Sequence, residues 1–317
     1  MQLNEMAEGL EPLDLTGTAE FASLLQSATD LGIPHSPGVR YVSRQTVVGG
    51  HRFHFLEWGE RSAPAVLLLH GGNQTAHAWD LVSLHLSDRY HVYALDQRGH
   101  GDSEWVRDQD YSPQTMASDA LGFIRQQGVE SPIVMGHSMG GGVTMALAVR
   151  EPELPRALVF VDTGPAIDAM NEGAQEIRNF ITANVEFDHI EDFVQRVQAY
   201  DPFRPREHME RTARYNLFRR ADGKYVSKSD RVLHNPDRPM PPEGQRPTLA
   251  SVGVIGCPTL ILRGEHSRVL TRERAQEFAD ALPGGRWVEV ERCGHNVQTQ
   301  NTPGFLAAVA PFLEELG

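Results

Sequence analysis

The sequence predicts a protein of the α/β class, with a doubly wound, mostly parallel sheet and an inserted helical segment. Short apolar runs typical of buried strands alternate with helical stretches between residues 65 and 161 and again after residue 258. This alternation is the order that builds a parallel sheet. It stops between residues 164 and 250, where helical stretches and a proline-rich segment contain no strand of core character. A glycine-rich turn, Gly136–Gly140, joins one strand directly to a helix.

The composition is that of an ordinary soluble globular protein, with 317 residues of which 40% are hydrophobic and 22% charged. The net charge of −13 argues against non-specific binding to nucleic acid or to an anionic membrane. Residues 1–11 lack the features of a signal peptide, and no apolar run approaches the length of a membrane span. Cys257 and Cys293 are expected at opposite edges of the sheet, roughly 15 Å or more apart. We therefore expect two reduced thiols in a cytoplasmic protein.

The first 40 residues are predicted to form an N-terminal arm with one helix, Thr18–Leu31, which could pack on the domain or on a second copy in a homodimer. Arg44–Val48 and Arg52–Trp58 flank Gly49-Gly50. A two-residue glycine turn between short strands indicates a β-hairpin.

The strands that follow share a short apolar run and end in polar or glycine-containing turns. They are Ala65–Leu69, His91–Leu95, Pro132–Met135, Ala157–Val161, Pro258–Leu262 and Arg286–Val290. The helices expected between and after them are Ala76–Leu86, Pro113–Gln127, residues 141–149, Thr271–Ala281 and Phe305–Leu316. Ser112 followed by Pro113 is a typical start for the second of these helices.

We assign residues 41–163 and 251–317 to the core and residues 164–250 to a helical cap, or lid. In open α/β sheets, ligands bind beyond the carboxyl ends of the strands, which is where such a cap would lie. The helices expected in the cap are Glu172–Thr182, Ile190–Ala199 and Glu207–Asn216.

The turn Gly136-His137-Ser138-Met139-Gly140 has the pattern Gly-x-Ser-x-Gly between a strand and a helix. Glycines on both sides let such a turn close tightly, so the Ser138 hydroxyl projects at the end of the strand. A serine hydroxyl is a poor nucleophile at neutral pH and needs a nearby base that a carboxylate orients.

His295 is the strongest candidate for this base because it follows the last strand in a Gly-His turn, at the same edge of the sheet. His266, at the end of the preceding strand, is its rival. We expect His70 and His100 to brace loops, and the side chain of His137 to point away from the site.

Four segments now stand in the order and spacing of the α/β-hydrolase superfamily: His70-Gly71-Gly72, Asp96–Ser103, Gly136–Gly140 and Gly294-His295. The chain resembles a capped, esterase-like member from about Val42 to its end, most of the cap excluded. The resemblance implies an eight-stranded, mostly parallel sheet. It also implies Ser138 as nucleophile, His295 as general base, and backbone N–H groups of Gly72 and Met139 as the oxyanion hole.

The acid of the triad departs from the commonest pattern of that superfamily. Many members place Asp where this chain has Ser267, and a serine cannot offset an imidazolium charge. Two carboxylates could. Asp162 follows the strand Ala157–Val161, and Glu265 follows the strand Pro258–Leu262. Some members place the acid at the position of Asp162, so we favour it over Glu265. Asp96 is instead expected to pair with Arg98 and brace a turn.

The predicted function is a serine hydrolase that cleaves a small or medium carboxylic ester, thioester or lactone through an acyl-enzyme. Two alternatives remain: a carbon–carbon hydrolase of a vinylogous diketone with the same triad, and a non-catalytic ligand-binding protein. The expected partner is a small-molecule substrate, with no nucleic acid and no membrane. We predict no cofactor and no metal, because the sequence has neither His-x-x-x-His on a helix nor Cys-x-x-Cys, and no Gly-Lys-Ser/Thr phosphate loop.

Aromatic and methionine side chains of the cap could line the substrate pocket, although packing of the cap onto the core is the simpler interpretation. They are Met170, Phe180, Phe187, Phe193, Tyr200, Phe203, Met209 and Tyr215. Arg204, Arg206, Arg211 and Arg214 lie near Glu207 and Glu210. These arginines could bind a substrate carboxylate, but the pattern favours a solvated, ion-paired helix.

Overall fold

The computed structural model describes residues 11–165, 171–183, 185–238 and 247–317. Its central sheet has the strand order β1-β2-β3-β5-β4-β6-β7-β11-β12. The pairs from β1 to β5 are antiparallel and those from β5 to β12 are parallel. The eight predicted strands are all present, and the two-residue strand β1 adds a ninth at one edge.

The strand bounds agree closely with the apolar runs of the sequence. They are β1 Leu13–Asp14, β2 Tyr41–Val48, β3 His51–Trp58, β4 Ala65–Leu69, β5 His91–Leu95, β6 Ile133–His137, β7 Ala157–Val161, β11 Thr259–Gly264 and β12 Gly285–Val290. The core and arm helices are α2 Ala19–Asp30, α3 Asp80–Leu86, α4 Pro113–Gln126, α5 Met139–Arg150, α9 Leu249–Val252, α10 Arg272–Asp280, α11 Val297–Gln300 and α12 Thr302–Glu315. The stretch predicted as one helix over residues 76–86 begins instead as a 3₁₀ turn, η1 Ala76–Trp79.

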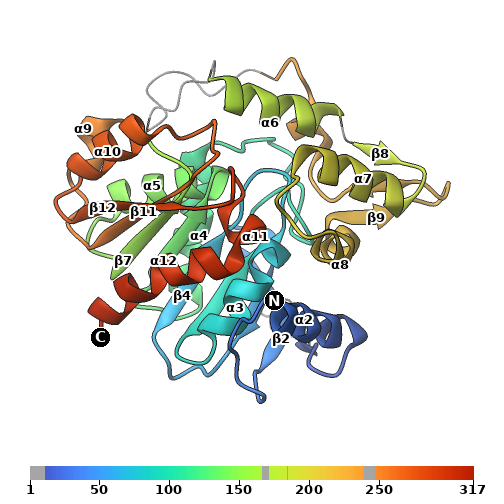
Figure 1. The fold of residues 1–317 in the computed structure, drawn as a ribbon, viewed down its shortest axis with the longest axis horizontal. Helices are drawn as coiled ribbons and strands as arrows, with labels where there is room; N and C mark the ends of the chain where they lie inside the picture. Colours follow the sequence, from blue (N-terminus) through green and yellow to red (C-terminus); the bar gives the residue numbers. More distant parts are fainter. Residues whose placement is uncertain (1–10, 166–170, 184, 239–246) are drawn as a thin grey trace.

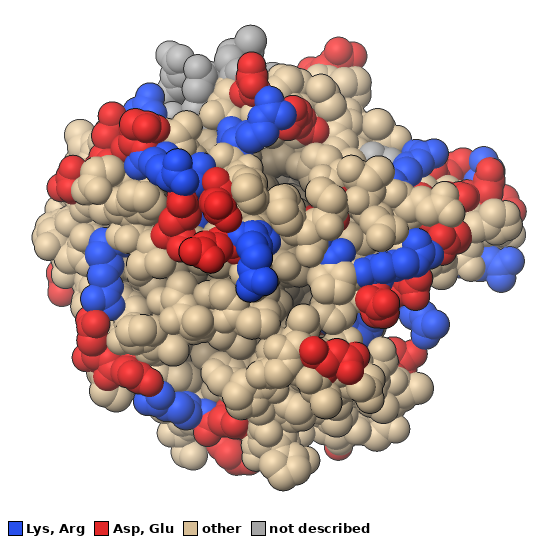
Figure 2. Space-filling model, in the orientation of Figure 1, with Lys and Arg blue, Asp and Glu red and all other residues tan. Residues whose placement is uncertain are grey.

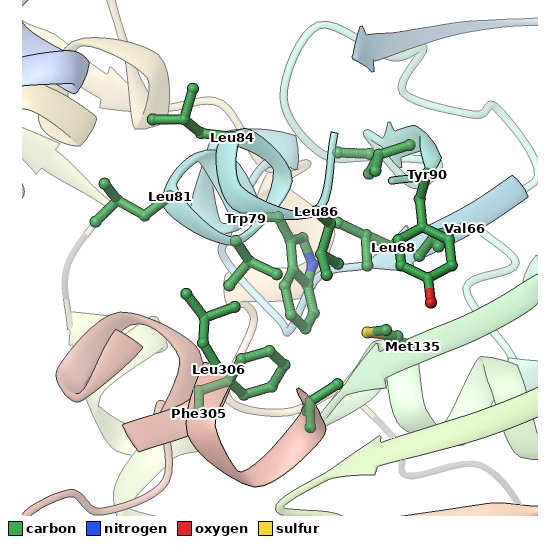
Figure 3. Packing of buried hydrophobic residues seen from close by; sticks show 14 of the residues in the cluster. Val66, Leu68, Trp79, Leu81, Leu84, Leu86, Tyr90, Met135, Phe305 and Leu306 are labelled. Atoms are coloured by element: carbon green, nitrogen blue, oxygen red, sulfur yellow. The ribbon is translucent and has the colours of Figure 1, made fainter. Parts of the chain in front are cut away.

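Helices cover both faces of the sheet (Figure 1). Successive residues of a strand point to opposite faces, and because the central strands β4 and β7 are apolar throughout, both faces must be covered. Val66 and Leu68 of β4 pack in one buried cluster with Trp79 and Phe305, from η1 and α12 (Figure 3). Leu67 and Leu69 of β4 face the opposite side and pack in the second cluster, with residues of α4, α5 and α10. The Trp79 and Phe305 rings meet edge to face, with centroids 5.9 Å apart. These two buried layers cover the two faces of the sheet beneath the site.

The cap contains the three predicted helices and a small sheet that the sequence did not indicate. Its elements are α6 Glu172–Ala183, β8 Glu186–Phe187, α7 Ile190–Tyr200, α8 Arg206–Asn216, β9 Leu217–Arg219, β10 Tyr225–Ser227 and η2 Arg231–His234. The strands pair antiparallel in the order β8-β10-β9. Because each has only two or three residues, none forms the apolar run by which the core strands were found. The cap also has a hydrophobic cluster of its own, which includes Phe187, Val194 and Met209.

The N-terminal arm and the cap both pack on the core. Helix α2 of the arm lies beside α8 of the cap and beside α3 of the core (Figure 1). Phe21 and Leu24 of α2 belong to the same buried cluster as Leu56 of the sheet. Arg211 of α8 is buried and forms an ion pair with buried Asp80 of α3, with Nη1 2.6 Å from Oδ2. This contact joins cap and core directly.

The surface carries basic and acidic side chains intermixed over the face drawn in Figure 2, with no large patch of either sign. Among the described residues, no helix combines the length and apolar character that crossing a membrane requires. Cys257 and Cys293 are both free thiols, as predicted. Burial raises the pKa of Cys293 to about 12, so this thiol stays protonated and unreactive at neutral pH.

Candidate active site

Ser138 lies in the tight turn between β6 and α5, with φ 50° and ψ −113°. A positive φ is costly for a residue with a side chain and persists only where the surroundings impose it. A Cβ on Gly136 would lie 2.3 Å from Oγ1 of Thr144. A Cβ on Gly140 would lie 2.3 Å from the carbonyl oxygen of Leu69. Only glycine fits at either position, so the two glycines of the motif allow the turn that presents Ser138.

A cavity of about 480 Å³ lies between the carboxyl ends of the strands and the cap. Its wall includes every residue that the sequence assigned to the reaction, apart from the alternative acid Glu265: Gly72, Ser138, Met139, Asp162 and His295. Residues of α6 and α7 complete the wall on the cap side. The volume suits a small or medium-sized organic ligand.

His295 and Asp162 are in direct contact: Nδ1 of His295 lies 2.7 Å from Oδ2 of Asp162. Asp162 is completely buried and follows β7, whereas His295 follows β12. The carboxylate also accepts the backbone N–H of Gly264 at 3.1 Å and the hydroxyl of Ser267 at 2.5 Å. Asp162 therefore has the contacts that keep Nδ1 of His295 as a hydrogen-bond donor. Nε2, the other ring nitrogen, is then left unprotonated and able to accept a proton.

Ser138 and His295 line the same cavity, but no hydrogen bond joins their side chains in this structure. Within the described part of the chain, Nε2 of His295 has no hydrogen-bond partner. Catalytic hydrogen bonds commonly tighten only when substrate binds, so the arrangement is compatible with proton transfer between the two side chains.

Glu265 and His266 lie outside the cavity wall. The carboxylate of Glu265 accepts the backbone N–H of Arg292 at 2.8 Å. The exposed ring of His266 stacks on Phe203, with centroids 5.1 Å apart. Neither is brought to Ser138 or His295, so the structure places the alternative acid and the rival base away from the candidate site.

Two backbone N–H groups remain available beside Ser138. The N–H of Ser138 donates to Val161 at 3.1 Å, and that of Gly140 donates to His70 at 3.1 Å. In the described residues, the N–H groups of Gly72 and Met139 have no acceptor, and both residues line the cavity. They are therefore free to donate to a group bound in the cavity.

His137 does not point away from the site, contrary to our expectation. Its Nε2 donates to the carbonyl oxygen of His295 at 2.9 Å, and its Nδ1 lies 3.1 Å from Oε1 of Gln74. Burial, together with the neighbouring His295 ring, lowers the pKa of His137 well below its usual value. Gln74 in turn accepts the N–H of Gly71 at 3.0 Å and donates to Asn296 at 3.1 Å. His137, through the carbonyl oxygen of His295, and Gln74, through Asn296, thus each contact the turn that carries His295.

The cap reaches the same turn through Asp201, at the end of α7. Nε2 of Gln300 donates to Asp201 Oδ1 at 2.6 Å, while Oε1 of Gln300 accepts the N–H of Gly294 at 2.5 Å. Burial raises the pKa of Asp201. Nothing in the sequence singled out Gln74, Asp201 or Gln300. The contacts of Asp201 with Asn296 and Gln300, and of Gln74 with Asn296, join residues 95 to 222 positions apart, and such contacts leave no local pattern.

His70 and His100 brace loops, as predicted. Nε2 of His70 accepts the N–H of Gln97 at 3.0 Å, and Nδ1 of His100 donates to the carbonyl of Arg98 at 3.0 Å. The predicted pairing of Asp96 with Arg98 is wrong. The guanidinium of Arg98 instead forms a bidentate ion pair with Asp119 on α4.

Asp96 pairs with His54 at 2.7 Å and accepts the N–H of Asp102 at 2.9 Å. His54, Asp96 and Asp102 bring metal-ligand atoms close together. The second nitrogen of His54 is occupied by Ser43, and Nζ of Lys228 lies 2.6 Å from Asp102. Because the ammonium of Lys228 already pairs with Asp102, and both nitrogens of His54 have partners, we assign no metal to these three residues.

The aromatic residues of the cap divide between two roles. Phe180, Phe193 and Tyr200 line the cavity. The others pack elsewhere, with Phe187 and Met209 in the cap's own cluster, Phe203 against His266 and Tyr215 against His77. Met170 lies outside the described residues.

The fold and this constellation define the class of protein. The chain belongs to the Alpha/beta hydrolase family, to which residues 66–309 match. It is similar to esterase Rv0045c of Mycobacterium tuberculosis, with 29% identity over 95% of this chain and 98% of that protein. The crystal structure of that esterase matches with a TM-score of 0.74 over 95% of this chain and 99% of the other.

Two further relatives differ in the activity that their names state. A 3-hydroxybutyrate-oligomer hydrolase of Cupriavidus necator is 29% identical over 82% of this chain and 92% of its own length. A 2-hydroxymuconate semialdehyde hydrolase of a Pseudomonas species is 23% identical over 86% of this chain and 94% of its own length. The fold of an α/β hydrolase with a mostly parallel sheet and an inserted helical region is thereby established, while the relatives do not agree on a substrate.

Proposed function

We propose that this protein is a serine hydrolase that cleaves a small or medium carboxylic ester, thioester or lactone. Oγ of Ser138 attacks the carbonyl carbon while Nε2 of His295 takes the hydroxyl proton. The carbonyl oxygen becomes an oxyanion that accepts hydrogen bonds from the N–H groups of Gly72 and Met139. Asp162 holds Nδ1–H of His295 and stabilises the imidazolium that forms.

The tetrahedral intermediate collapses when the bond to the leaving oxygen or sulfur breaks, and His295 returns its proton to that atom. Ser138 is then acylated. A water molecule gives a proton to His295 and attacks the acyl carbon, and the second collapse releases the acid and restores the serine hydroxyl. The cap covers the cavity and limits the access of bulk water during these steps.

The observation that carries this proposal is the 2.7 Å contact between His295 and buried Asp162, inside the cavity that Ser138 lines. A buried carboxylate is costly unless it is hydrogen-bonded. The Asp162 carboxylate has three hydrogen-bond partners, namely Gly264, Ser267 and His295. Two relatives at 29% identity whose names state an esterase and a hydrolase of a hydroxybutyrate oligomer support ester cleavage.

Hydrolysis of p-nitrophenyl butyrate tests the proposal. We expect turnover by the wild-type protein, and a loss of about 10⁵-fold in Ser138→Ala, because the nucleophile and base act as a unit. Ser118→Ala, on the exposed face of α4, is the matched control and should keep full activity. A fluorophosphonate should add its mass to Ser138 alone, as peptide mass spectrometry would report.

The two alternatives give different results in the same experiment. A carbon–carbon hydrolase would leave the ester nearly untouched and cleave a vinylogous diketone in a Ser138-dependent reaction. Ligand binding without turnover of either substrate, and without labelling of Ser138, would show that the site is not catalytic.

A further inference from the structure

Arg204 lies in the cavity wall, in the segment between α7 and α8. Its Nη2 donates to Oγ1 of Thr212 at 2.6 Å and to the carbonyl of His208 at 3.3 Å. Among the described residues, neither Nε nor Nη1 has a hydrogen-bond partner, and the guanidinium forms no ion pair. Nε is shielded from solvent, whereas Nη1 is accessible. Removal from water lowers the pKa of Arg204 to about 10, which still leaves the guanidinium charged at neutral pH. Arg204 is thus a half-buried cation with one accessible nitrogen that no group of the described protein engages.

The two acidic residues whose charges act on Arg204 are already engaged by other partners. Asp201 accepts hydrogen bonds from Gln300 and Asn296, and Asp80 pairs with Arg211 at 2.6 Å. Neither carboxylate contacts the guanidinium of Arg204. Nη1 of Arg204 therefore remains available to an anionic group that enters the cavity, whereas Nε is too enclosed for a ligand to reach it.

The other two arginines of the described cavity wall, Arg178 and Arg238, already contact protein groups. Nη2 of Arg178 donates to the carbonyl oxygens of Pro236 and Arg238, the latter at 2.9 Å. The guanidinium of Arg238 lies over the Tyr111 ring, 5.3 Å from its centroid. The described wall thus holds three arginines but only two carboxylates, Asp162 and Asp201, although the whole protein has a net charge of −13. The excess of positive charge favours an anionic ligand.

We infer that the substrate is an ester that carries a free carboxylate, which binds Arg204. This inference rests on the proposed ester hydrolysis. A guanidinium binds a carboxylate with strong, charge-assisted hydrogen bonds, and the low dielectric of a buried site strengthens them. The hydrocarbon part of such a substrate would contact the apolar wall that α5, α6 and the loop after β11 provide: Met139, Met145, Ile177, Ile181 and Val269.

A pair of nearly isosteric substrates tests the inference. Mono-p-nitrophenyl glutarate carries a terminal carboxylate, and p-nitrophenyl 5-methylhexanoate has an isopropyl group in its place. We expect wild-type protein to hydrolyse the glutarate with a kcat/KM about tenfold to a hundredfold higher. Arg204→Met should remove most of this preference, because it should lower kcat/KM for the glutarate far more than for the neutral ester. Arg206→Met is the matched control, because Arg206 forms exposed ion pairs with Glu191 and Glu210.

Equal hydrolysis of both esters by the wild-type protein would overturn the inference, as would an equal loss for both in Arg204→Met, which is the signature of a merely structural role. The proposed function would survive either result. If neither ester is cleaved, the proposed function fails, and binding still reports on Arg204. Calorimetry with glutarate and its uncharged diamide on Ser138→Ala should then show binding of glutarate alone, and none in Ser138→Ala with Arg204→Met. Absence of glutarate binding to Ser138→Ala would reject the carboxylate site.

Discussion

The hydroxyl of Ser267 donates a hydrogen bond of 2.5 Å to Oδ2 of Asp162, the same oxygen that receives Nδ1–H of His295. Ser267 itself is held in place because its Oγ accepts the backbone N–H groups of Val269 at 3.1 Å and Leu270 at 3.3 Å. Ser267 occupies the position at which many members of the superfamily carry the acid. Here it orients a carboxylate that comes from the neighbouring strand β7.

Asp162→Asn should lower kcat for p-nitrophenyl butyrate by about 10³- to 10⁴-fold, because the amide cannot stabilise an imidazolium and can reverse the tautomer of His295. Glu265→Gln should change kcat less than about threefold, since Glu265 contacts the backbone of Arg292 rather than His295. Steady-state kinetics of both variants check this assignment. A large loss in Glu265→Gln with a small one in Asp162→Asn would move the acid to Glu265.

Ser267→Ala should lower kcat by about three- to tenfold and leave KM nearly unchanged. The variant removes one of three hydrogen bonds to the Asp162 carboxylate without removing its charge. Ser267→Thr keeps a hydroxyl and should recover part of the activity, which distinguishes orientation of Asp162 from simple packing. An unchanged kcat in Ser267→Ala would show that the other two contacts suffice.

The core of this fold could be predicted because its strands are continuous apolar runs. The predicted bounds of β4, β5 and β7 are those observed, at Ala65–Leu69, His91–Leu95 and Ala157–Val161. The small sheet of the cap could not be found in this way, since strands of two or three residues show no period. The proposed nucleophile and base lie in local motifs, whereas the contact of Gln74 with Asn296 joins residues 222 positions apart.

The arginines of α8 and of the segment before it show a second limit of sequence analysis. The spacing predicted a solvated, ion-paired helix, and Arg206 and Arg214 do form exposed ion pairs. Arg211 is instead buried against Asp80, and Arg204 lines the cavity. Which arginine faces solvent depends on how the cap packs against the core, and this packing has no local signal.

Asp201→Ala should lower kcat about tenfold. Without this carboxylate, Gln300 loses the partner that fixes it against the N–H of Gly294, next to His295. Asp201→Asn keeps an acceptor oxygen and should lose only about two- to threefold. Asp188→Ala, an exposed residue of the cap, is the control and should match wild type. Equal kinetics for Asp201→Ala and wild type would show that the cap does not position His295 through this contact.

Arg211→Met should destabilise the protein by about 3–5 kcal/mol, because it leaves Asp80 buried without its guanidinium partner. Although burial opposes it, the charges of His77 and Arg211 hold the pKa of Asp80 below its usual value. Arg214→Met breaks only an exposed contact with Glu20 and should cost less than about 1 kcal/mol. Urea unfolding of both variants measures the difference. Similar values would mean that the buried pair contributes no more than the exposed one.

The stability of the fold should fall as the pH drops below about 6.5, and His100 should account for part of this loss. Burial lowers the pKa of His100 from its ordinary 6.5 to about 3 in the folded protein. Between these values the unfolded chain binds a proton that the folded protein does not, so acid favours unfolding. The contribution of His100 is complete above pH 6.5 and is lost at about 1.4 kcal/mol per pH unit on the way down.

His100→Asn should therefore reduce the pH dependence of unfolding between pH 6 and pH 4 by about one proton, since an amide can still donate to the carbonyl of Arg98 but does not titrate. The free energy of unfolding, measured in urea at several pH values, gives this slope for wild type and variant. His189→Asn, at an exposed histidine, is the matched control for the substitution. If His100→Asn leaves the slope unchanged, His100 is not the residue through which acid weakens the fold.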